Sequence, residues 1–163
     1  MTNFSRMQLL RGKQSSVRPP WTKPEAEFIE NCSRCHACIE QCPEHIIVKG
    51  RGSFPEIDFS KGECTFCEHC VEACPTSAIS KSDQQIPWLL KIQINQACLA
   101  QQNVVCITCG EFCEYSAIRF PAKLGGIAHP EINLNQCTGC GACFATCPTQ
   151  AIQMQYLESP DLI

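Results

Sequence analysis

The sequence lacks any apolar run long enough to cross a bilayer. A membrane-spanning helix needs about 20 consecutive apolar residues, and no stretch of the 163 residues approaches that length. The opening MTNFSRMQLLRGKQSSVRPPW also lacks an apolar core, a small-residue cleavage site and a twin-arginine pair, so it does not read as an export signal. We therefore expect a chain that does not insert into a membrane and stays in the cytoplasm.

An excess of positive charge is also missing. Thirteen Lys and Arg face sixteen Asp and Glu, which gives a formal net charge of −3, and four clusters held by thiolates would lower it to about −11. This balance leaves no basic face to meet phosphates and excludes nucleic acid as a partner. Several of the basic residues precede the first acidic residue, Glu25, and form a basic N-terminal arm: Arg6, Arg11, Lys13, Arg18 and Lys23.

The motifs of enzyme active sites are absent as well. There is no G-x-G-x-x-G after a strand, no Ser/His/Asp arrangement and no open metal position with a plausible base beside it. We therefore expect a protein that is not an enzyme and has no catalytic residues.

Cysteine, in contrast, is abundant, with sixteen residues in the chain. In a short secreted protein this density would indicate a disulfide scaffold. In a cytoplasmic protein thiols stay reduced, so dense cysteines indicate metal binding.

The cysteines occur in four similar groups. The segments are CSRCHACIEQCPEHII, CTFCEHCVEACPTSAI, CITCGEFCEYSAI and CTGCGACFATCPTQAI. Three of them follow C-x-x-C-x-x-C-x-x-x-C-P. The third keeps only C-x-x-C-x-x-x-C, and seven residues separate its remaining cysteine, Cys98, from Cys106.

A longer repeat pairs these groups. KGRGSFPEIDFSKGEC at residues 49–64 resembles KLGGIAHPEINLNQC at residues 123–137, so the repeating unit contains two groups. The alternation of Trp88, Leu90, Ile92 and Ile94 predicts a strand that opens the second unit, whereas EAEFIENC opens the first less clearly. AIRF and AIQM suit short closing strands.

We therefore predict an α+β protein made of two tandem ferredoxin-like modules around a small core. The predicted boundaries are an N-terminal arm at 1–24, module 1 at 25–79, a linker at 80–85, module 2 at 86–157 and a tail at 158–163.

The spacing of the cysteines is typical of 4Fe–4S clusters. In this pattern three cysteines surround one cluster, and the fourth, followed by proline, binds the neighbouring cluster. Exchange of the fourth cysteine within each module predicts three sets of ligands: Cys32, Cys35, Cys38 and Cys74; Cys64, Cys67, Cys70 and Cys42; Cys137, Cys140, Cys143 and Cys113.

The third group leaves Cys106, Cys109 and Cys147 in need of one more thiolate. Cys98 is the only cysteine not yet assigned, so we predict that it completes a fourth cluster. The alternative is that Cys98 is a small buried apolar residue and that this cluster is absent. Zinc also binds four thiolates, but it favours two C-x-x-C pairs and needs neither a third cysteine at i+6 nor a Cys-Pro.

The four groups together resemble the bacterial-type ferredoxins. The SRMQLLRG start, VRPPW at residues 17–21 and the stretched CLAQQNVVCITC resemble, more closely, the NapF family of ferredoxin-type proteins, which are encoded with periplasmic nitrate reductases. The resemblance implies a cytoplasmic iron–sulfur accessory factor that binds the molybdenum-containing catalytic subunit before export and helps to assemble its 4Fe–4S cluster. An electron carrier that relays electrons between redox proteins is the alternative, because both functions use the same ligands.

Overall fold

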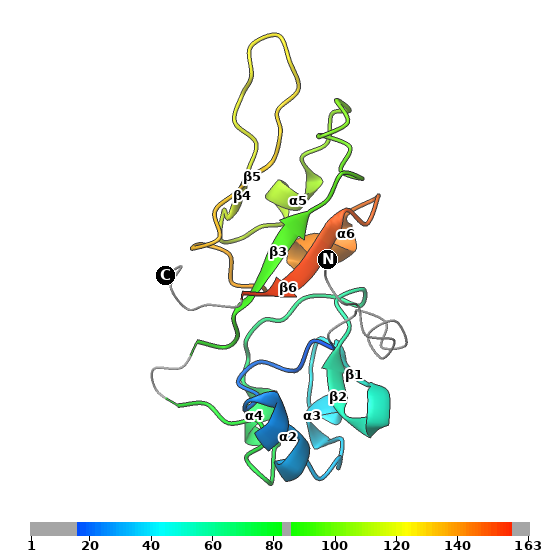
Figure 1. Ribbon diagram of the computed structural model, residues 1–163, viewed down its shortest axis with the longest axis vertical. Coiled ribbons are helices and arrows are strands. Elements are labelled where there is room, and N and C mark those ends of the chain that lie inside the picture. The colour runs from blue at the N-terminus through cyan, green and yellow to red at the C-terminus, as the bar shows by residue number, and fades with distance from the viewer. Residues whose placement is uncertain (1–15, 83–85, 158–163) are drawn as a thin grey trace, which may run out of the picture.

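The computed structural model describes residues 16–82 and 86–157 as a small protein of short helices and strands (Figure 1). The first half of the chain contains α2 (Glu25–Asn31), α3 (Ala37–Glu40), β1 (Ile47–Lys49), the 3-10 turn η1 (Arg51–Ser53), β2 (Pro55–Ile57) and α4 (His69–Glu72). The second half contains β3 (Leu90–Ile94), α5 (Thr108–Glu111), β4 (Ile118–Arg119), β5 (Glu131–Ile132), α6 (Ala142–Thr146) and β6 (Ile152–Tyr156). This mixture agrees with the α+β class. Residues 1–15 of the predicted arm, 83–85 of the linker and the tail at 158–163 lie outside the described residues.

The strands pair into three antiparallel two-stranded sheets. β1 pairs with β2, with Ile47 opposite Ile57, and β4 pairs with β5, with Ile118 opposite Ile132. These two hairpins occupy corresponding places in the sequence repeat. The internal repeat is therefore visible in the local structure as well as in the amino-acid sequence.

The third sheet joins the two ends of the second half. Strand β3 pairs over five residues with β6, from Leu90 opposite Tyr156 to Ile94 opposite Ile152, and the two lie side by side in Figure 1. The predicted alternation is confirmed, since Trp88, Leu90 and Ile92 are buried. In the first half the corresponding pairing shrinks to one isolated bridge between Thr22 and Ile79.

The first half opens with a helix. EAEFIEN forms α2, which follows Pro24 and has two acidic residues in its first turn, Glu25 and Glu27. Proline and acidic side chains both suit a helix N-terminus. Phe28, the one buried residue of α2, anchors the helix to the core of the first half.

Residues 17–21 (VRPPW) belong to the folded body. Although they lie in the predicted arm at 1–24, both Pro19 and Pro20 are fully buried and Trp21 is only 3% exposed. The segment is apolar apart from Arg18, and its burial removes both proline rings and the indole from water. The sequence also suggests that the two prolines hold residues 4–12 away from the modules, and those residues lie outside the described part of the chain.

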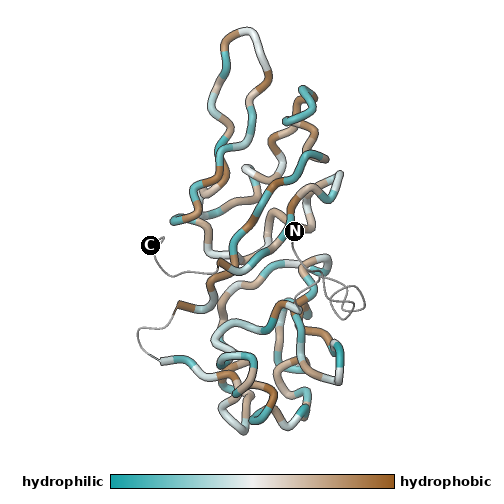
Figure 2. The backbone as a smooth tube through the Cα atoms, in the orientation of Figure 1, coloured by the Kyte–Doolittle hydropathy of each residue, from teal (hydrophilic) through white to brown (hydrophobic). Residues whose placement is uncertain are grey.

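The apolar core is divided into small pieces, and the cysteines are part of it. The two largest clusters of buried residues include Cys38, Cys42 and Cys70 in the first half and Cys137 and Cys143 in the second. Figure 2 shows the hydrophobic segments as short stretches interrupted by polar ones. Across residues 16–82 and 86–157, no helix has the length and apolar character needed to cross a membrane.

Candidate metal centres

All sixteen cysteines lie among the described residues, and all have free thiols. They line four separate pockets, and each pocket is lined by four of them. The sets are Cys32, Cys35, Cys38 and Cys74; Cys42, Cys64, Cys67 and Cys70; Cys113, Cys137, Cys140 and Cys143; and Cys98, Cys106, Cys109 and Cys147. We call them the first, second, third and fourth pockets in that order. Each set mixes two cysteine groups in the crossed manner expected from the sequence.

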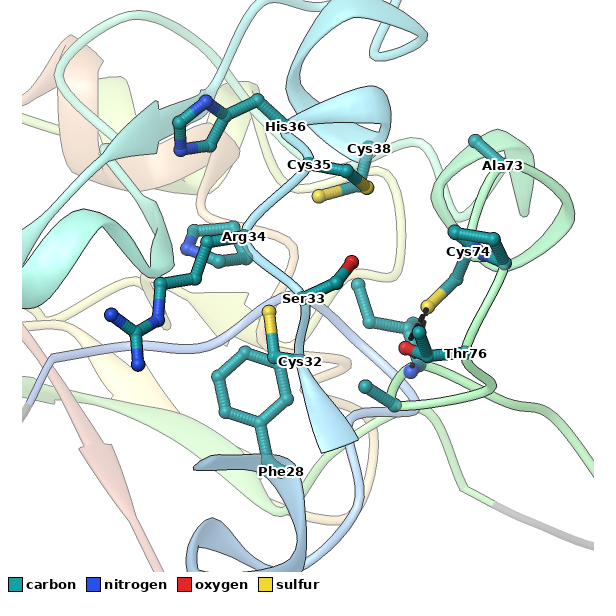
Figure 3. Close-up of a pocket in the computed structure, with 14 residues that line it drawn as sticks. Phe28, Cys32, Ser33, Arg34, Cys35, His36, Cys38, Ala73, Cys74 and Thr76 are labelled. Atoms are coloured by element: carbon teal, nitrogen blue, oxygen red, sulfur yellow. Dashed lines mark hydrogen bonds between the residues drawn. The ribbon is translucent and has the colours of Figure 1, made fainter. Parts of the chain in front are cut away.

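The first pocket illustrates how the chain builds such a site. Three cysteines come from the first group, between the end of α2 and α3, and Cys74 comes from the second group on the opposite side (Figure 3). Arg34 and His36, within the loop, have φ values of 58° and 66°. These left-handed residues turn the backbone twice in a few residues, so successive cysteine side chains face the same space.

The last cysteine of three groups accepts hydrogen bonds at sulfur. Backbone N–H groups donate to it from four or five residues downstream: Ile79 to Cys74 at 3.4 Å, Ala117 to Cys113 at 3.3 Å and Ala151 to Cys147 at 3.3 Å. Burial raises the pKa of Cys74 and Cys147, but these bonds and those from Thr76 and Thr149 outweigh it, so both pKa values lie below the ordinary value. The fold therefore favours thiolates at these positions.

Four cysteines that precede the last one of their group have raised pKa values instead. Burial raises the pKa of Cys38 and Cys109 to about 11 and that of Cys64 and Cys70 to about 12, and neighbouring cysteines add to the effect. These residues are neutral thiols in the metal-free chain at pH 7. Metal binding must therefore displace their protons, and the metal supplies the positive charge that makes a buried thiolate stable.

Cys98 reaches the fourth pocket through a compact turn. It is 8% exposed and is followed by a turn in which the Gln102 N–H donates to the Cys98 carbonyl at 3.1 Å and the Val104 N–H to the Leu99 carbonyl at 2.9 Å. The chain thus doubles back between Cys98 and Cys106. Both residues line one pocket despite their separation in sequence.

The four cysteines of each pocket lie around a cavity and do not converge on a single point. Within residues 16–82 and 86–157, no three His, Cys, Asp or Glu side chains converge closely enough for one metal ion. Four thiolates on a single zinc ion would lie within about 4 Å of one another. A cubane cluster binds each thiolate at a different iron atom, so its ligands line the walls of a cavity. The donor set and its arrangement fit a 4Fe–4S cluster.

Several pocket-lining residues are not cysteines, and the sequence did not identify all of them. Phe28 lines the first pocket. Trp21 and Phe66, which line the second pocket and stack edge to face at 6.3 Å, were missed. The available signal was the apolar composition of VRPPW within the polar first 24 residues, because burial of apolar side chains is favourable.

Comparison with known families identifies an iron–sulfur domain in each half of the chain. Residues 31–79 match the 4Fe-4S dicluster domain, and residues 129–152 match a 4Fe-4S binding domain. The first match contains cysteine groups one and two, and the second contains group four. The comparison therefore supports 4Fe–4S clusters as the cofactor, without fixing their number.

Whole-chain relatives extend the likeness to all four groups. The ferredoxin-type protein NapF of Haemophilus influenzae is 43% identical over 96% of both chains. NapF of Escherichia coli is 42% identical over 95% of this chain and 96% of its own. A more distant relative, the methylamine utilization ferredoxin-type protein MauM of Methylophilus methylotrophus, is 30% identical over 82% of this chain and 66% of its own length.

Proposed function

Because the chain belongs to the NapF family of ferredoxin-type iron–sulfur proteins, we propose that it is a cytoplasmic accessory factor in the maturation of periplasmic nitrate reductase. Its partner is the molybdenum-containing catalytic subunit in its precursor form, and its role is to help assemble the 4Fe–4S cluster of that subunit before export. The membership and the 4Fe–4S domains establish an iron–sulfur protein of the nitrate reductase system. The partner, the role and the compartment are the proposal.

We propose that the chain binds four 4Fe–4S clusters, one in each pocket. The observation that supports this most directly is that every one of the sixteen cysteines lines a pocket with three others. The corresponding architecture is two tandem ferredoxin-like modules at 25–79 and 86–157, each with two clusters that exchange their fourth ligand. A bound 4Fe–4S cluster supplies one-electron redox chemistry.

The protein's own contribution is to hold and shield these groups. The cysteines bind the iron, the downstream N–H groups stabilise the sulfur charge, and apolar residues such as Phe28, Ile46 and Ile118 limit the access of water to the pockets. The named relatives are ferredoxin-type proteins and not enzymes by name, and we assign no catalytic residue.

The proposal is tested by mixing the cluster-loaded protein with cluster-free nitrate reductase precursor under anaerobic conditions. Maturation predicts a stable complex, a gain of iron and sulfide by the precursor and recovery of nitrate reduction. Protein freed of its clusters serves as the matched control, because it supplies the same chain without iron. A precursor that stays cluster-free in both reactions would rule out a role in assembly.

An electron carrier remains the second candidate. It is favoured by the proximity of the second and third pockets, where the Cys64 N–H donates to the Cys140 carbonyl at 2.8 Å. A carrier predicts fast oxidation of the reduced protein by the mature catalytic subunit without a lasting complex. The same mixing experiment, followed by stopped-flow absorbance, separates the two functions.

A further inference from the structure

The two halves of the protein meet at a cluster of aromatic rings. Phe59 and Phe66 come from the first half, and Trp88 and Phe144 from the second. The ring centroids of Phe59 and Trp88 are 6.0 Å apart, those of Phe66 and Trp88 are 5.7 Å apart, and those of Phe59 and Phe144 are 6.2 Å apart. Phe59 is 5% exposed. We call these four residues the aromatic junction.

The junction brings two cysteine pockets into direct contact. The backbone N–H of Cys64, which lines the second pocket, donates to the carbonyl of Cys140, which lines the third, at 2.8 Å. The indole N–H of Trp88 donates to the carbonyl of Thr138 at 2.9 Å. Two nearby residues of the fourth cysteine group therefore accept these hydrogen bonds: Cys140 from the first half and Thr138 from Trp88 of the junction.

Two glycines in that loop are explained by the contact with the junction. Gly139 and Gly141 have φ values of 75° and 89°. The corresponding positions of the second group are Phe66 and Glu68, with φ values of 55° and 67°. Residues with side chains therefore occupy this backbone conformation elsewhere in the same protein, and the conformation alone does not require glycine.

What the glycines provide is space. A Cβ atom on Gly141 would lie 2.0 Å from the Phe59 ring, and one on Gly139 would lie 2.3 Å from the Leu90 carbonyl oxygen. Both distances are far below van der Waals contact. The loop around the third pocket therefore has glycine at the two positions where Phe59 of the first half and β3 pack against it.

Residues 17–21, which we call the strap, form a second connection between the two halves. The Val17 carbonyl accepts from the Ile57 N–H of the first half at 2.7 Å. The Arg18 N–H donates to the Tyr156 hydroxyl of the second half at 3.3 Å, and the Trp21 N–H donates to the Pro87 carbonyl at 2.7 Å. The strap therefore bonds to both halves.

We infer that the aromatic junction and the strap hold the second and third pockets as a fixed pair, so that the four pockets form one continuous series and not two independent pairs. The order of the series is first, second, third and fourth pocket, with the contact between Cys64 and Cys140 at its centre. Phe59 is a positioning residue in this arrangement, because it touches no pocket directly. The inference goes beyond the proposed maturation role and rests only on the proposal that the pockets bind clusters.

Hydrogen exchange of the cluster-loaded protein tests the contact itself. We expect the Cys64 amide to be protected in the wild type and to exchange at least tenfold faster in Phe59→Ala, with Phe59→Leu in between. Ile132→Ala is the control, because Ile132 is a partly buried apolar residue of β5 that packs within the second half and lies outside the junction, the strap and the four pockets. A Cys64 amide that exchanges like an exposed one in the wild type would overturn the inference, whatever the variants do.

Electron paramagnetic resonance tests the pairing of the pockets. Neighbouring reduced clusters split one another's signals, so the fully reduced Phe59→Ala protein should lose part of the splitting seen in the wild type and in Ile132→Ala. Iron content, measured on the same samples, should be equal in all three. Unchanged splitting in Phe59→Ala, together with faster exchange at Cys64, would show that the junction does not pair the clusters. Neither result depends on nitrate reductase, so this inference and the maturation role can fail separately.

Discussion

Seven residues separate Cys98 from Cys106, yet both line the fourth pocket. The intervening turn achieves this by burying Ala100 completely and by bonding its own backbone. A buried thiol could be explained by packing alone. Its position beside three other cysteines is better explained by ligation.

Cys98→Ser should therefore remove one cluster. Serine keeps the size of the side chain but is a poor ligand for iron, so the variant should lose about four iron atoms per chain and the corresponding signal of the reduced protein. Gln102→Ala controls for damage to the turn, because Gln102 bonds to Gln96 from the same segment and has no sulfur. Equal iron content in Cys98→Ser and the wild type would assign Cys98 to packing.

At this scale the sequence predicts which cysteines line the same pocket, and their role as ligands stays a prediction. The cysteine count, the repeated spacing and the exchange of the fourth cysteine were enough to group all sixteen residues as the pockets group them. The role of Gly141 could not be predicted, because it depends on Phe59 from a distant part of the chain. The structure shows that Gly141 leaves space for the Phe59 ring.

Among the elements, the segment around α5 in the third cysteine group exposes several large apolar side chains. Val105 in the turn before α5 is 78% exposed, and Phe112 just after α5 is 54% exposed. Val104, Ile107 and Tyr115 are also exposed. Apolar side chains gathered in one short segment of a folded protein often mark an interaction site. We expect this segment to contact the nitrate reductase precursor.

Replacing Val105 and Phe112 together with serine should weaken binding of the precursor about tenfold or more, because exposed apolar side chains supply most of the energy of such contacts. Cluster content should not change, since neither residue lines a pocket. Ile29→Ser, in an exposed apolar position on α2, is the control. Titration calorimetry under anaerobic conditions measures the effect, and equal affinities in all three proteins would contradict it.

The elements themselves were only partly predictable. The alternation at residues 88–94 predicts β3, and the closing strands β4 and β6 follow their cysteine groups as expected. The pairing of β3 with β6 could not be read from the pattern, because alternation shows which face of a strand is buried but not which strand lies beside it. The burial of Pro19 and Pro20 was missed for a similar reason, since their contacts come from elsewhere in the chain.

Over the whole molecule, the apolar core is too divided to hold the fold by itself. Cysteines belong to three of the four groups of buried residues, so the clusters would fill the centre of each half and join segments that have few other contacts. Small proteins of this kind often fold only with their metal.

Removal of the clusters with a chelator and an oxidant should therefore unfold the chain. Because Trp21 and Trp88 are both buried in the folded protein, their fluorescence should shift to that of indole in water at the same rate as iron is lost. Circular dichroism recorded in parallel reports the loss of the strands. A cooperative thermal transition that persists at the same temperature in the iron-free protein would show that the core is sufficient.

The central claim is that each of the four cysteine pockets binds one 4Fe–4S cluster. Its most direct test is the iron and acid-labile sulfide content of protein purified without oxygen. The account predicts about sixteen iron atoms and about sixteen sulfides per chain. About twelve of each would contradict the fourth cluster, and zinc in place of iron would contradict the assignment of all four pockets.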